Sequence, residues 1–275
     1  MARIVRRPLV DVQAGWPDSI PALLRRVYAA RGASTPELAQ PRLAGLLPPD
    51  RLRGLESATA LLADAMAADR HIVVVGDFDC DGATACATGV RGLRLLGARR
   101  VSHAVPNRMV HGYGLSPALV DELAALHPDL LLTVDHGIAC HAGIEAARAR
   151  GWRVVVTDHH LPGPRLPAAD AIVNPNLPGD EFPSKALAGV GVVFYLLLAL
   201  RRHLRGAGAL AAGEPDLSTL LDLVAVGTVA DLVPLDANNR TLVAAGLRRV
   251  RAGRGCAGLR PLIGACGRGA ARVAP

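Results

Sequence analysis

Aromatic residues and long apolar runs are both scarce in this sequence. Only 3% of the 275 residues are aromatic although 51% are hydrophobic, so the core must consist of leucine, valine and alanine. The longest apolar run, residues 186–200, is about 15 residues long and contains two glycines. A membrane-spanning helix needs roughly 20 apolar residues. The run is therefore interpreted as a buried helix, and a membrane protein is not expected.

Cysteine is sparse and has no pairing pattern. No two of the cysteines form a Cys-x-x-Cys pair, and their number is odd. The five cysteines are Cys80, Cys86, Cys140, Cys256 and Cys266. This argues against a disulfide framework and against a zinc ribbon. The basic N-terminus, residues 1–9, is not followed by the apolar stretch of a secretory signal. We therefore expect reduced thiols and a cytoplasmic location.

Lysine occurs once, at Lys185, so nearly all of the 31 basic residues are arginine, against 24 acidic residues. The net charge is +7. Guanidinium groups match the geometry of phosphate oxygens, so this balance favours a polyanionic partner such as nucleic acid. A bias toward arginine, alanine and glycine is also a compositional property of GC-rich genomes. The charge alone leaves both interpretations open.

Proline separates the N-terminal fifth of the chain from the rest. Residues 1–55 contain seven prolines, which divide them into short predicted helices, over 20–30 and 35–39. From residue 56 onward, helical patterns alternate with short β-branched runs. We predict a helical N-terminal leader (1–55) and an α/β domain (56–236). Residues 237–275 are predicted to start a linker helix and to end in a weakly ordered tail.

Five predicted strands each end in polar residues. The strands are expected over residues 71–76, 101–105, 129–134, 152–157 and 171–173. Because predicted helices separate most of them, the order indicates a parallel sheet flanked by helices, with its site at the carboxyl ends of the strands. In chain order, the residues after the strands are Asp77, Asp79 and Asp81; Asn107 and Arg108; Asp135 and His136; Asp158, His159 and His160; and Asn174 and Asn176.

The acidic residues after the first strand are costly unless a cation is near. Asp77, Asp79 and Asp81 lie within five residues and repel one another. A divalent metal ion removes that cost, because carboxylate oxygens are good ligands for Mg²⁺ and Mn²⁺; an acidic turn that faces water is the alternative. The convergence of acids and imidazoles from several strands favours a two-metal site. Asp231, at the end of an apolar helix predicted over 216–229, is a further acid in an unusual position.

Five short motifs, in this order, resemble those of the DHH phosphoesterase superfamily. They are Gly76-Asp77-Phe78-Asp79-Cys80-Asp81-Gly82, Arg108-x-x-x-Gly112-Tyr113-Gly114, Asp135-His136-Gly137, Asp158-His159-His160 and Gly227-Thr228-Val229-Ala230-Asp231. The last motif continues as Leu-Val-Pro-Leu and is followed by Asn238-Asn239-Arg240, a form similar to that of the single-strand-specific 5′→3′ DNA exonucleases of the superfamily. The resemblance covers roughly residues 50–260. It implies that residues 56–236 are a DHH phosphoesterase domain, an α/β fold with a parallel sheet of about five strands.

The resemblance also implies a ligand set for two Mn²⁺ or Mg²⁺ ions: Asp79, Asp81, Asp135, His159 and Asp231. From the residues themselves, Asp135 is the best candidate for a bridging carboxylate, because its strand is expected between the two others that carry ligands. Imidazole in the set shifts the preference toward Mn²⁺. Asp77 is either a further ligand or a residue that orients the ligands from behind.

Three residues are candidates for contact with a substrate. We assign His160 a catalytic role at the scissile phosphate or the leaving group, and the resemblance implies that Arg108 contacts phosphate. Tyr113 could stack on a base, as aromatic residues do with unpaired strands, or fill the core. For His111, in the same loop as Arg108, a substrate contact and a structural role stay open. His136 is assigned no functional role.

The resemblance implies hydrolysis of phosphodiester bonds in single-stranded DNA with two metal ions, in repair and recombination. We assign Asp135 and His160 as the catalytic residues. A helicase or a single-strand-binding protein is an expected partner. One alternative is a DHH enzyme acting on small substrates, such as a pyrophosphatase, an oligoribonuclease or a cyclic-dinucleotide phosphodiesterase. Another is a DNA-binding remnant without activity, because the exonucleases continue into a second domain and an oligonucleotide-binding fold. We therefore expect a chain truncated after the DHH domain.

Overall fold

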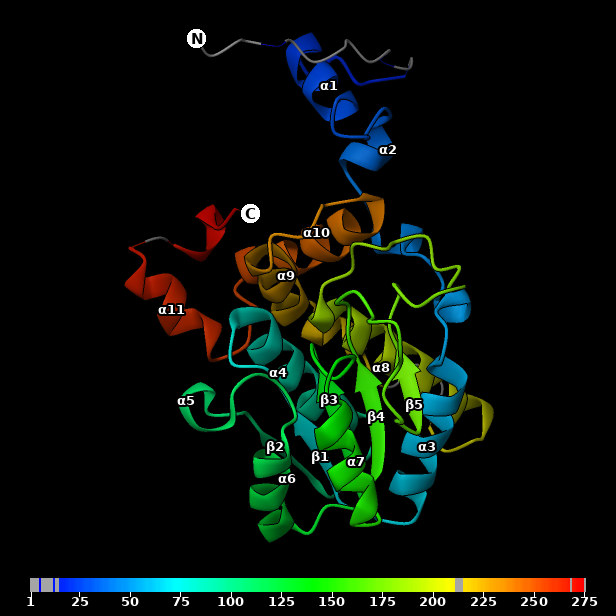
Figure 1. Ribbon diagram of the computed structural model, residues 1–275. Helices are drawn as coiled ribbons and strands as arrows, with labels where there is room; N and C mark the ends of the chain where they lie inside the picture. The colour runs from blue at the N-terminus through cyan, green and yellow to red at the C-terminus, as the bar shows by residue number, and fades with distance from the viewer. Residues whose placement is uncertain (1–4, 6–11, 13–14, 211–214, 268, 275) are drawn as a thin grey trace.

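Five parallel strands form the centre of the fold (Figure 1). The computed structural model describes residues 5, 12, 15–210, 215–267 and 269–274, so most of residues 1–9 lie outside the described part. The sheet has the order β2-β1-β3-β4-β5, and every neighbouring pair is parallel. Its strands are β1 (Ile72–Val75), β2 (Val101–Ala104), β3 (Leu130–Val134), β4 (Arg153–Thr157) and β5 (Ala171–Val173). The predicted parallel sheet of five strands is confirmed, and each strand lies within one residue of its expected bounds.

Helices cover both faces of the sheet. On one face, the core includes α3 (Leu55–Ala67), α4 (Cys80–Leu95), α8 (Gly189–Gly206) and α9 (Leu221–Ala230). On the other face, the core includes α6 (Pro117–Leu123) and α7 (His141–Ala149). Shorter 3₁₀ segments connect or extend these helices: η1 (Leu43–Gly45), η2 (Pro49–Arg51), η3 (Ala124–Leu126), η4 (Leu217–Leu220) and η5 (Ala270–Arg272).

The central strands are buried on both faces. In β1, Ile72 and Val74 enter the core beneath α3, α4 and α8, whereas Val73 and Val75 enter the core beneath α6 and α7. All four side chains are inaccessible to solvent. This explains why the strand is a continuous β-branched run instead of an alternation of apolar and polar residues. The double burial fixes the carboxyl end of β1, from which the first acidic loop departs.

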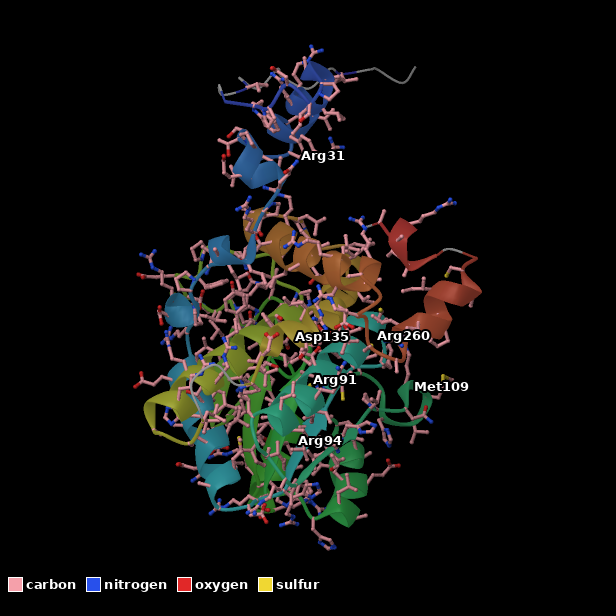
Figure 2. All side chains as sticks on the ribbon, turned by 180° about the vertical axis from the view of Figure 1, so that it is seen from behind. Arg31, Arg91, Arg94, Met109, Asp135 and Arg260 are labelled. Carbon is pink, nitrogen blue, oxygen red and sulfur yellow. The ribbon has the colours of Figure 1, made fainter. Side chains whose placement is uncertain are left out.

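The N-terminal helices project from the body of the molecule. The predicted helices 20–30 and 35–39 are observed as α1 (Ala22–Ala29) and α2 (Pro36–Ala39). α1 lies far from the sheet in Figure 1, and so does Arg31, just after α1, in Figure 2. Few contacts return to the body, among them a hydrogen bond of 3.1 Å from the Arg240 guanidinium to the Arg31 carbonyl. The leader boundary at residue 55 stays a prediction.

The C-terminal part is more regular than expected. After α10 (Ala237–Arg251), where a weakly ordered tail was predicted, the chain forms α11 (Leu259–Ala265) and η5. Leu259 is buried against Leu223 and Val250, so a small apolar cluster holds α11 to the body. The periodicity of the sequence did not predict α11, because the helix is short and glycines surround it in the sequence. Within the described ranges, no helix combines the length and the apolar character needed to cross a membrane.

The single lysine fastens the loop between β5 and α8. The Lys185 ammonium donates hydrogen bonds of 2.7 Å to the Pro175 carbonyl, the Asp180 carbonyl and the Asp180 carboxylate. Three acceptors around one point suit a compact ammonium, which has three rotatable donors, and do not suit a planar guanidinium. The loop leads directly into α8, so Lys185 helps to set where that helix begins.

We expect Lys185→Arg to destabilise the protein by about 1–2 kcal/mol, because a guanidinium cannot donate to all three acceptors at once. Urea unfolding of the two proteins measures the difference in the free energy of unfolding. Arg99→Lys, at an exposed ion pair with Asp69, provides the matched control and should change stability by less than about 0.5 kcal/mol. Equal stability of Lys185→Arg and the parent protein would contradict the role of the ammonium.

Candidate metal centre

Acidic side chains meet at the carboxyl ends of β1, β3 and β4. Asp77 and Asp81 follow β1, and Asp135 follows β3; their exposed fractions are 3%, 1% and 2%. Asp79 is exposed and caps α4 by accepting a hydrogen bond of 2.8 Å from the Gly82 amide. Asp231 directly follows α9, whose last residue is Ala230. Fully buried carboxylates are rare in proteins unless they are paired or bind a cation, and a group of three this close together indicates a site for a cation.

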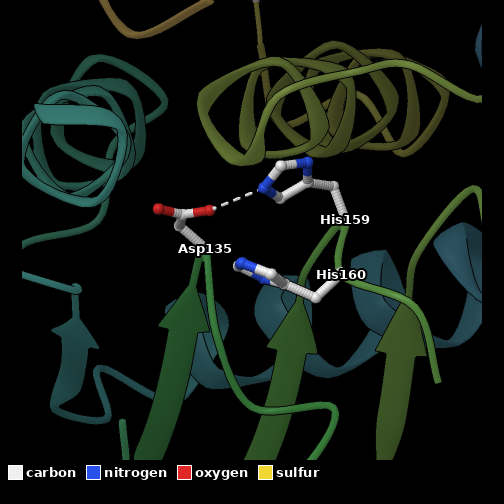
Figure 3. A group of neighbouring side chains, drawn as sticks. All are labelled: Asp135, His159 and His160. Carbon is white, nitrogen blue, oxygen red and sulfur yellow. Dashed lines mark ion pairs between the residues drawn. The ribbon is translucent and has the colours of Figure 1, made fainter. Parts of the chain in front are cut away.

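The tightest contact in this cluster joins Asp135 and His159 (Figure 3). Asp135 Oδ1 lies 3.2 Å from His159 Nε2, and Asp231 Oδ2 and Asp81 Oδ2 lie 3.7 Å and 4.0 Å from the same nitrogen. Asp135 Oδ1 and His159 Nε2 are both buried and make no conventional hydrogen bond to other described residues. Buried atoms with lone pairs aimed at one another fit the ligation of a metal ion by oxygen and imidazole nitrogen.

The ligand atoms fall into two groups that share no residue. In each group they lie within 4.8 Å of one another: Asp77, Asp79 and Asp135 in one, and Asp81, His159 and Asp231 in the other. A further group of the same size, Asp135, His159 and His160, joins the two. The structure thus brings together all five residues predicted as ligands. It also places Asp77 beside Asp79 and Asp135, where it can be a ligand itself instead of a residue behind the ligands.

The carboxylates raise one another's pKa. Burial, followed by the charge of Asp135, raises the pKa of Asp81 to about 8. Burial, followed by the charge of Asp79, raises the pKa of Asp135 to about 8. The pKa values of Asp77 and Asp231 are raised too, mainly by burial. The fold therefore concentrates negative charge at a place where only a strong cation can offset it.

The N-terminus of α8 holds Asp81 in place. The Gly189 amide donates to Asp81 Oδ2 at 2.6 Å, and the Val190 amide donates to Asp81 Oδ1 at 3.0 Å. The apolar run 186–200, interpreted as a buried helix from its first residue, is helical only from Gly189, where α8 begins. Glycine is required there because a Cβ atom would lie 2.4 Å from Asp135 Oδ1. The start of α8 thus touches two carboxylates of the cluster.

We expect Gly189→Ala to weaken metal binding and to destabilise the protein by about 1–3 kcal/mol, because the new Cβ must displace Asp135 or the helix. Gly206→Ala is the matched control in the same helix, since a Cβ at Gly206 meets nothing within 4 Å. That control should stabilise the helix slightly, by up to about 1 kcal/mol. Thermal unfolding and Mn²⁺ titration of the two variants test the contrast. Similar results for both would show that the close approach at residue 189 is unimportant.

Asp158 orients His160. Asp158 is 1% exposed, and its Oδ1 accepts hydrogen bonds from the His159 amide, the His160 amide and His160 Nδ1, at 2.7, 3.0 and 2.7 Å. The hydrogen bond to Asp158 raises the pKa of His160 to about 9, in spite of partial burial. For Asp158 itself burial opposes ionisation, but the hydrogen bonds together lower its pKa. These contacts favour the protonated form of the His160 imidazole, which is half-exposed beside Asp135 (Figure 3).

A row of rings leads from Arg108 to His160. Arg108, the first residue of α5 (Arg108–His111), lies with its guanidinium 4.7 Å from the centroid of the Phe78 ring. Phe78 meets Tyr113 edge-on at 6.4 Å, and Tyr113 meets His160 at 6.2 Å. The three residues predicted to contact substrate are thus linked through Phe78. Sequence reasoning gave Phe78 no role, although a phenylalanine between two candidate ligands was a signal.

His111 stabilises the loop that carries Arg108. Its Nδ1 accepts a hydrogen bond of 3.0 Å from the Asn107 amide, and its Nε2 lies 3.1 Å from Glu122 Oε1. Its side chain is only 4% exposed. Of the two roles left open for His111, the structure favours the structural one. Tyr113, in contrast, is 51% exposed and does not fill the core.

Residues 71–228 match the model of the DHH family, N-terminal domain. Among curated proteins, the chain is 52% identical to the single-stranded-DNA-specific exonuclease RecJ of Dickeya dadantii (strain 3937), over 99% of the chain and 48% of that protein. It is 50% identical to the protein of the same name from Escherichia coli (strain K12), over 98% of the chain and 47% of that protein. The chain spans about half the length of the curated relatives it matches.

Solved structures of similar proteins contain metal ions. One is an exonuclease RecJ bound to manganese, with a TM-score of 0.71 and 42% identity, covering 82% of this chain and 54% of that one. RecJ of Thermus thermophilus in complex with Mn²⁺ has the same TM-score of 0.71 at 39% identity, covering 88% and 33%. The Mg²⁺ complex from the same organism has a TM-score of 0.61 at 36% identity, over 88% and 30%. The chain is therefore similar in fold and sequence to proteins solved with either ion.

Proposed function

Because this chain belongs to the DHH family, we propose that it is a metal-dependent phosphodiesterase that removes nucleotides from single-stranded DNA in the 5′→3′ direction. The curated relatives are named as single-strand-specific exonucleases, and about half of their length is represented here. The activity would belong to DNA repair and recombination. A helicase or a single-strand-binding protein would supply or hold the unpaired strand, and a cytoplasmic location fits such a substrate.

The observation that carries the proposal is the pair of ligand groups at the edge of the sheet. Asp77, Asp79 and Asp135 would hold one divalent ion, and Asp81, His159 and Asp231 would hold the other, with Asp135 Oδ1 at the junction, 3.2 Å from His159 Nε2. The donor set of carboxylates and one imidazole fits Mn²⁺ and Mg²⁺, with a preference for Mn²⁺. Two such ions, when bound, supply a nucleophilic water at neutral pH and neutralise charge on the phosphate.

The chain's own residues would bind and orient the phosphodiester. His160, kept protonated by Asp158, would donate a hydrogen bond to a phosphate oxygen or a proton to the leaving oxygen. Arg108 would contact a phosphate from its place over the Phe78 ring. Tyr113, half-exposed between Phe78 and His160, would stack on an unpaired base. Stacking requires an unpaired strand, which gives the preference for single-stranded DNA its physical basis.

The proposal is tested by supplying the 275-residue chain with Mn²⁺ and three substrates. These are a 5′-phosphorylated single DNA strand, inorganic pyrophosphate and short oligoribonucleotides. We expect release of mononucleotides from the DNA strand and little turnover of the others. Turnover of only the small substrates would identify a different DHH activity. DNA binding without hydrolysis in either Mn²⁺ or Mg²⁺ would identify the non-catalytic alternative.

We expect Arg108→Ala to lower kcat/KM on the DNA strand by roughly tenfold to a hundredfold, through the loss of a charge-assisted contact to phosphate. Arg99→Ala is the matched control, because Arg99 is an exposed arginine paired with Asp69 before the amino end of β2, whereas Arg108 follows the carboxyl end of the same strand. It should leave kcat/KM within about twofold. Steady-state kinetics at two salt concentrations measure both variants. An Arg108→Ala enzyme as active as the control would exclude the phosphate contact.

A further inference from the structure

His136 is completely buried between the carboxyl ends of two strands. It follows Asp135 after β3, yet its Nε2 lies 3.0 Å from the carbonyl oxygen of Val75, the last residue of β1. Paired residues of β1 and β3 run only as far as Val75 and Thr133. The imidazole therefore links the two strands just beyond the end of their backbone ladder. On β1, the acidic loop begins two residues after this link, at Asp77.

The hydrogen bond fixes the tautomer of the ring. A carbonyl oxygen can only accept, so Nε2 must carry the hydrogen. Nδ1 then keeps its lone pair and faces the Cys140 thiol, whose Sγ is 4.0 Å away. Burial lowers the pKa of His136, in keeping with a neutral ring. Both ring nitrogens thus have partners, and both partners lie on other parts of the chain.

The backbone on either side of the ring is unusual and firmly held. Asp135 has a φ of 65°, which is uncommon for a residue with a side chain. Its amide donates to the Thr157 carbonyl at 3.0 Å, and the Thr133 hydroxyl donates to the His136 carbonyl at 2.9 Å. Such a conformation persists only where the surroundings determine it from several sides. The His136 side chain is one of these constraints, and it is the one that reaches β1.

The loop around Tyr113 and Gly114 also packs against this ring. A Cβ atom on Gly114 would lie 2.7 Å from Cys140 Sγ and 3.4 Å from His136 Nδ1. Gly114 has a φ of 69° and directly follows Tyr113. His136 and Cys140 together thus form the surface against which this loop packs. One buried side chain touches the parts of the chain that carry Asp135, Tyr113 and the acidic loop.

We propose that His136 is a positioning residue, which sets Asp135 against the acidic loop after β1 through the hydrogen bond from Nε2 to the Val75 carbonyl. The inference rests on the proposed function, because it concerns the same metal centre. Asp135 belongs to one ligand group together with Asp77 and Asp79, which lie on the other side of that hydrogen bond. Loosening it lets the ligand atoms of this group separate.

Two amide variants separate this role from a general need for a polar side chain. In His136→Gln the amide nitrogen can take the place of Nε2 and donate to Val75, whereas in His136→Asn the shorter side chain reaches only the place of Nδ1. We expect His136→Asn to bind Mn²⁺ roughly tenfold to a hundredfold more weakly, as is typical when a residue that orients metal ligands is lost. His136→Gln should stay within about threefold of the parent protein. The loss of the free Mn²⁺ signal in electron paramagnetic resonance measures both affinities.

A second readout needs no metal. The Asp135 amide is bonded to the Thr157 carbonyl, so its hydrogen exchange in metal-free protein should be about tenfold faster in His136→Asn and near normal in His136→Gln. Val154→Ala, a fully buried site at the opposite end of β4, controls for lost stability and should leave Mn²⁺ affinity and this exchange rate unchanged. Equal behaviour of the Gln and Asn variants in the exchange experiment would overturn the positioning role. If the parent chain fails to bind Mn²⁺ or to cleave DNA, the proposed function fails, and the exchange rates still decide the role of His136.

Discussion

Asp135→Asn is expected to stop metal-dependent hydrolysis and at the same time to make the metal-free protein more stable. Asp135 lies in two of the ligand groups, so its loss should lower kcat by at least about a thousandfold, roughly 4 kcal/mol of transition-state stabilisation. Its carboxylate is buried, is repelled by Asp81 and Asp79 and accepts no conventional hydrogen bond at Oδ1. A neutral amide removes the repulsion. Asparagine is preferred to alanine because residue 135 has a φ of 65°, which asparagine tolerates.

The gain in stability should depend on pH in a defined direction. In the unfolded chain Asp135 has a pKa of about 4, whereas in the folded protein its pKa is raised to about 8. Below about 4 the group is protonated in both states, and the variant has no advantage. Between these values folding takes up a proton, so the stability of the parent protein falls as the pH rises. The advantage of Asp135→Asn should therefore grow from about pH 4 to pH 8, by roughly 5 kcal/mol for a shift of this size, and then stay constant.

Unfolding by urea at several pH values, in the presence of a chelator, measures this dependence. Asp121→Asn is a suitable control, because Asp121 is an exposed acid paired with Arg150; its loss should change stability little at any pH. Added Mn²⁺ should stabilise the parent protein and have little effect on Asp135→Asn. Near-normal hydrolysis by Asp135→Asn would refute its place at the junction of the two ligand groups.

The sheet and most helices could be predicted because their patterns are local. β1, β3 and β4 are short β-branched or leucine runs that end in polar residues, and Ser116 caps α6 directly before a proline. Convergence of the strand ends then follows from parallel topology alone. α11 and α5 were missed because short helices carry little periodicity and because, unlike the equally short α2, neither begins with a capping threonine or serine followed directly by proline. Their positions are set by packing, such as that of Leu259.

In the metal centre, the types of residue were predictable and their partners were not. Asp135 and His159 follow different strands, and nothing in the sequence states that their side chains meet at 3.2 Å. The sequence left open whether Asp77 is a ligand or lies behind the ligands, whereas the fold places it with Asp79 and Asp135. His136 was given no role because a histidine beside a candidate ligand has no distinguishing pattern. Its contact with Val75 is a long-range one, across 61 positions.

Asp158→Asn is expected to have the opposite effect on stability from Asp135→Asn, although both residues are buried aspartates after neighbouring strands. Asp158 accepts three hydrogen bonds at Oδ1, from the amides of residues 159 and 160 and from the His160 ring, and one at Oδ2 from the Ile138 amide. An asparagine has a single acceptor oxygen. Its NH₂ group must therefore occupy the position of either Oδ1 or Oδ2, where it faces a donor. Leaving buried donors without an acceptor should cost about 2–4 kcal/mol. Hydrolysis should also fall by about tenfold to a hundredfold, because His160 loses the partner that orients it.

The two variants are best measured side by side, by urea unfolding in chelator and by kinetics in Mn²⁺. Each replaces one buried ionisable carboxyl group with a neutral amide, so a general effect of charge would shift both in the same direction. Hydrogen bonding decides the sign instead: the carboxylate of Asp158 is saturated by donors, and that of Asp135 faces other acids. Stabilisation by Asp158→Asn, or destabilisation by Asp135→Asn in metal-free protein at pH 8, would contradict this assignment. Opposite changes in stability would show that the Asp158 carboxylate stabilises the fold, whereas the Asp135 carboxylate destabilises the metal-free fold and is suited to bind a metal ion.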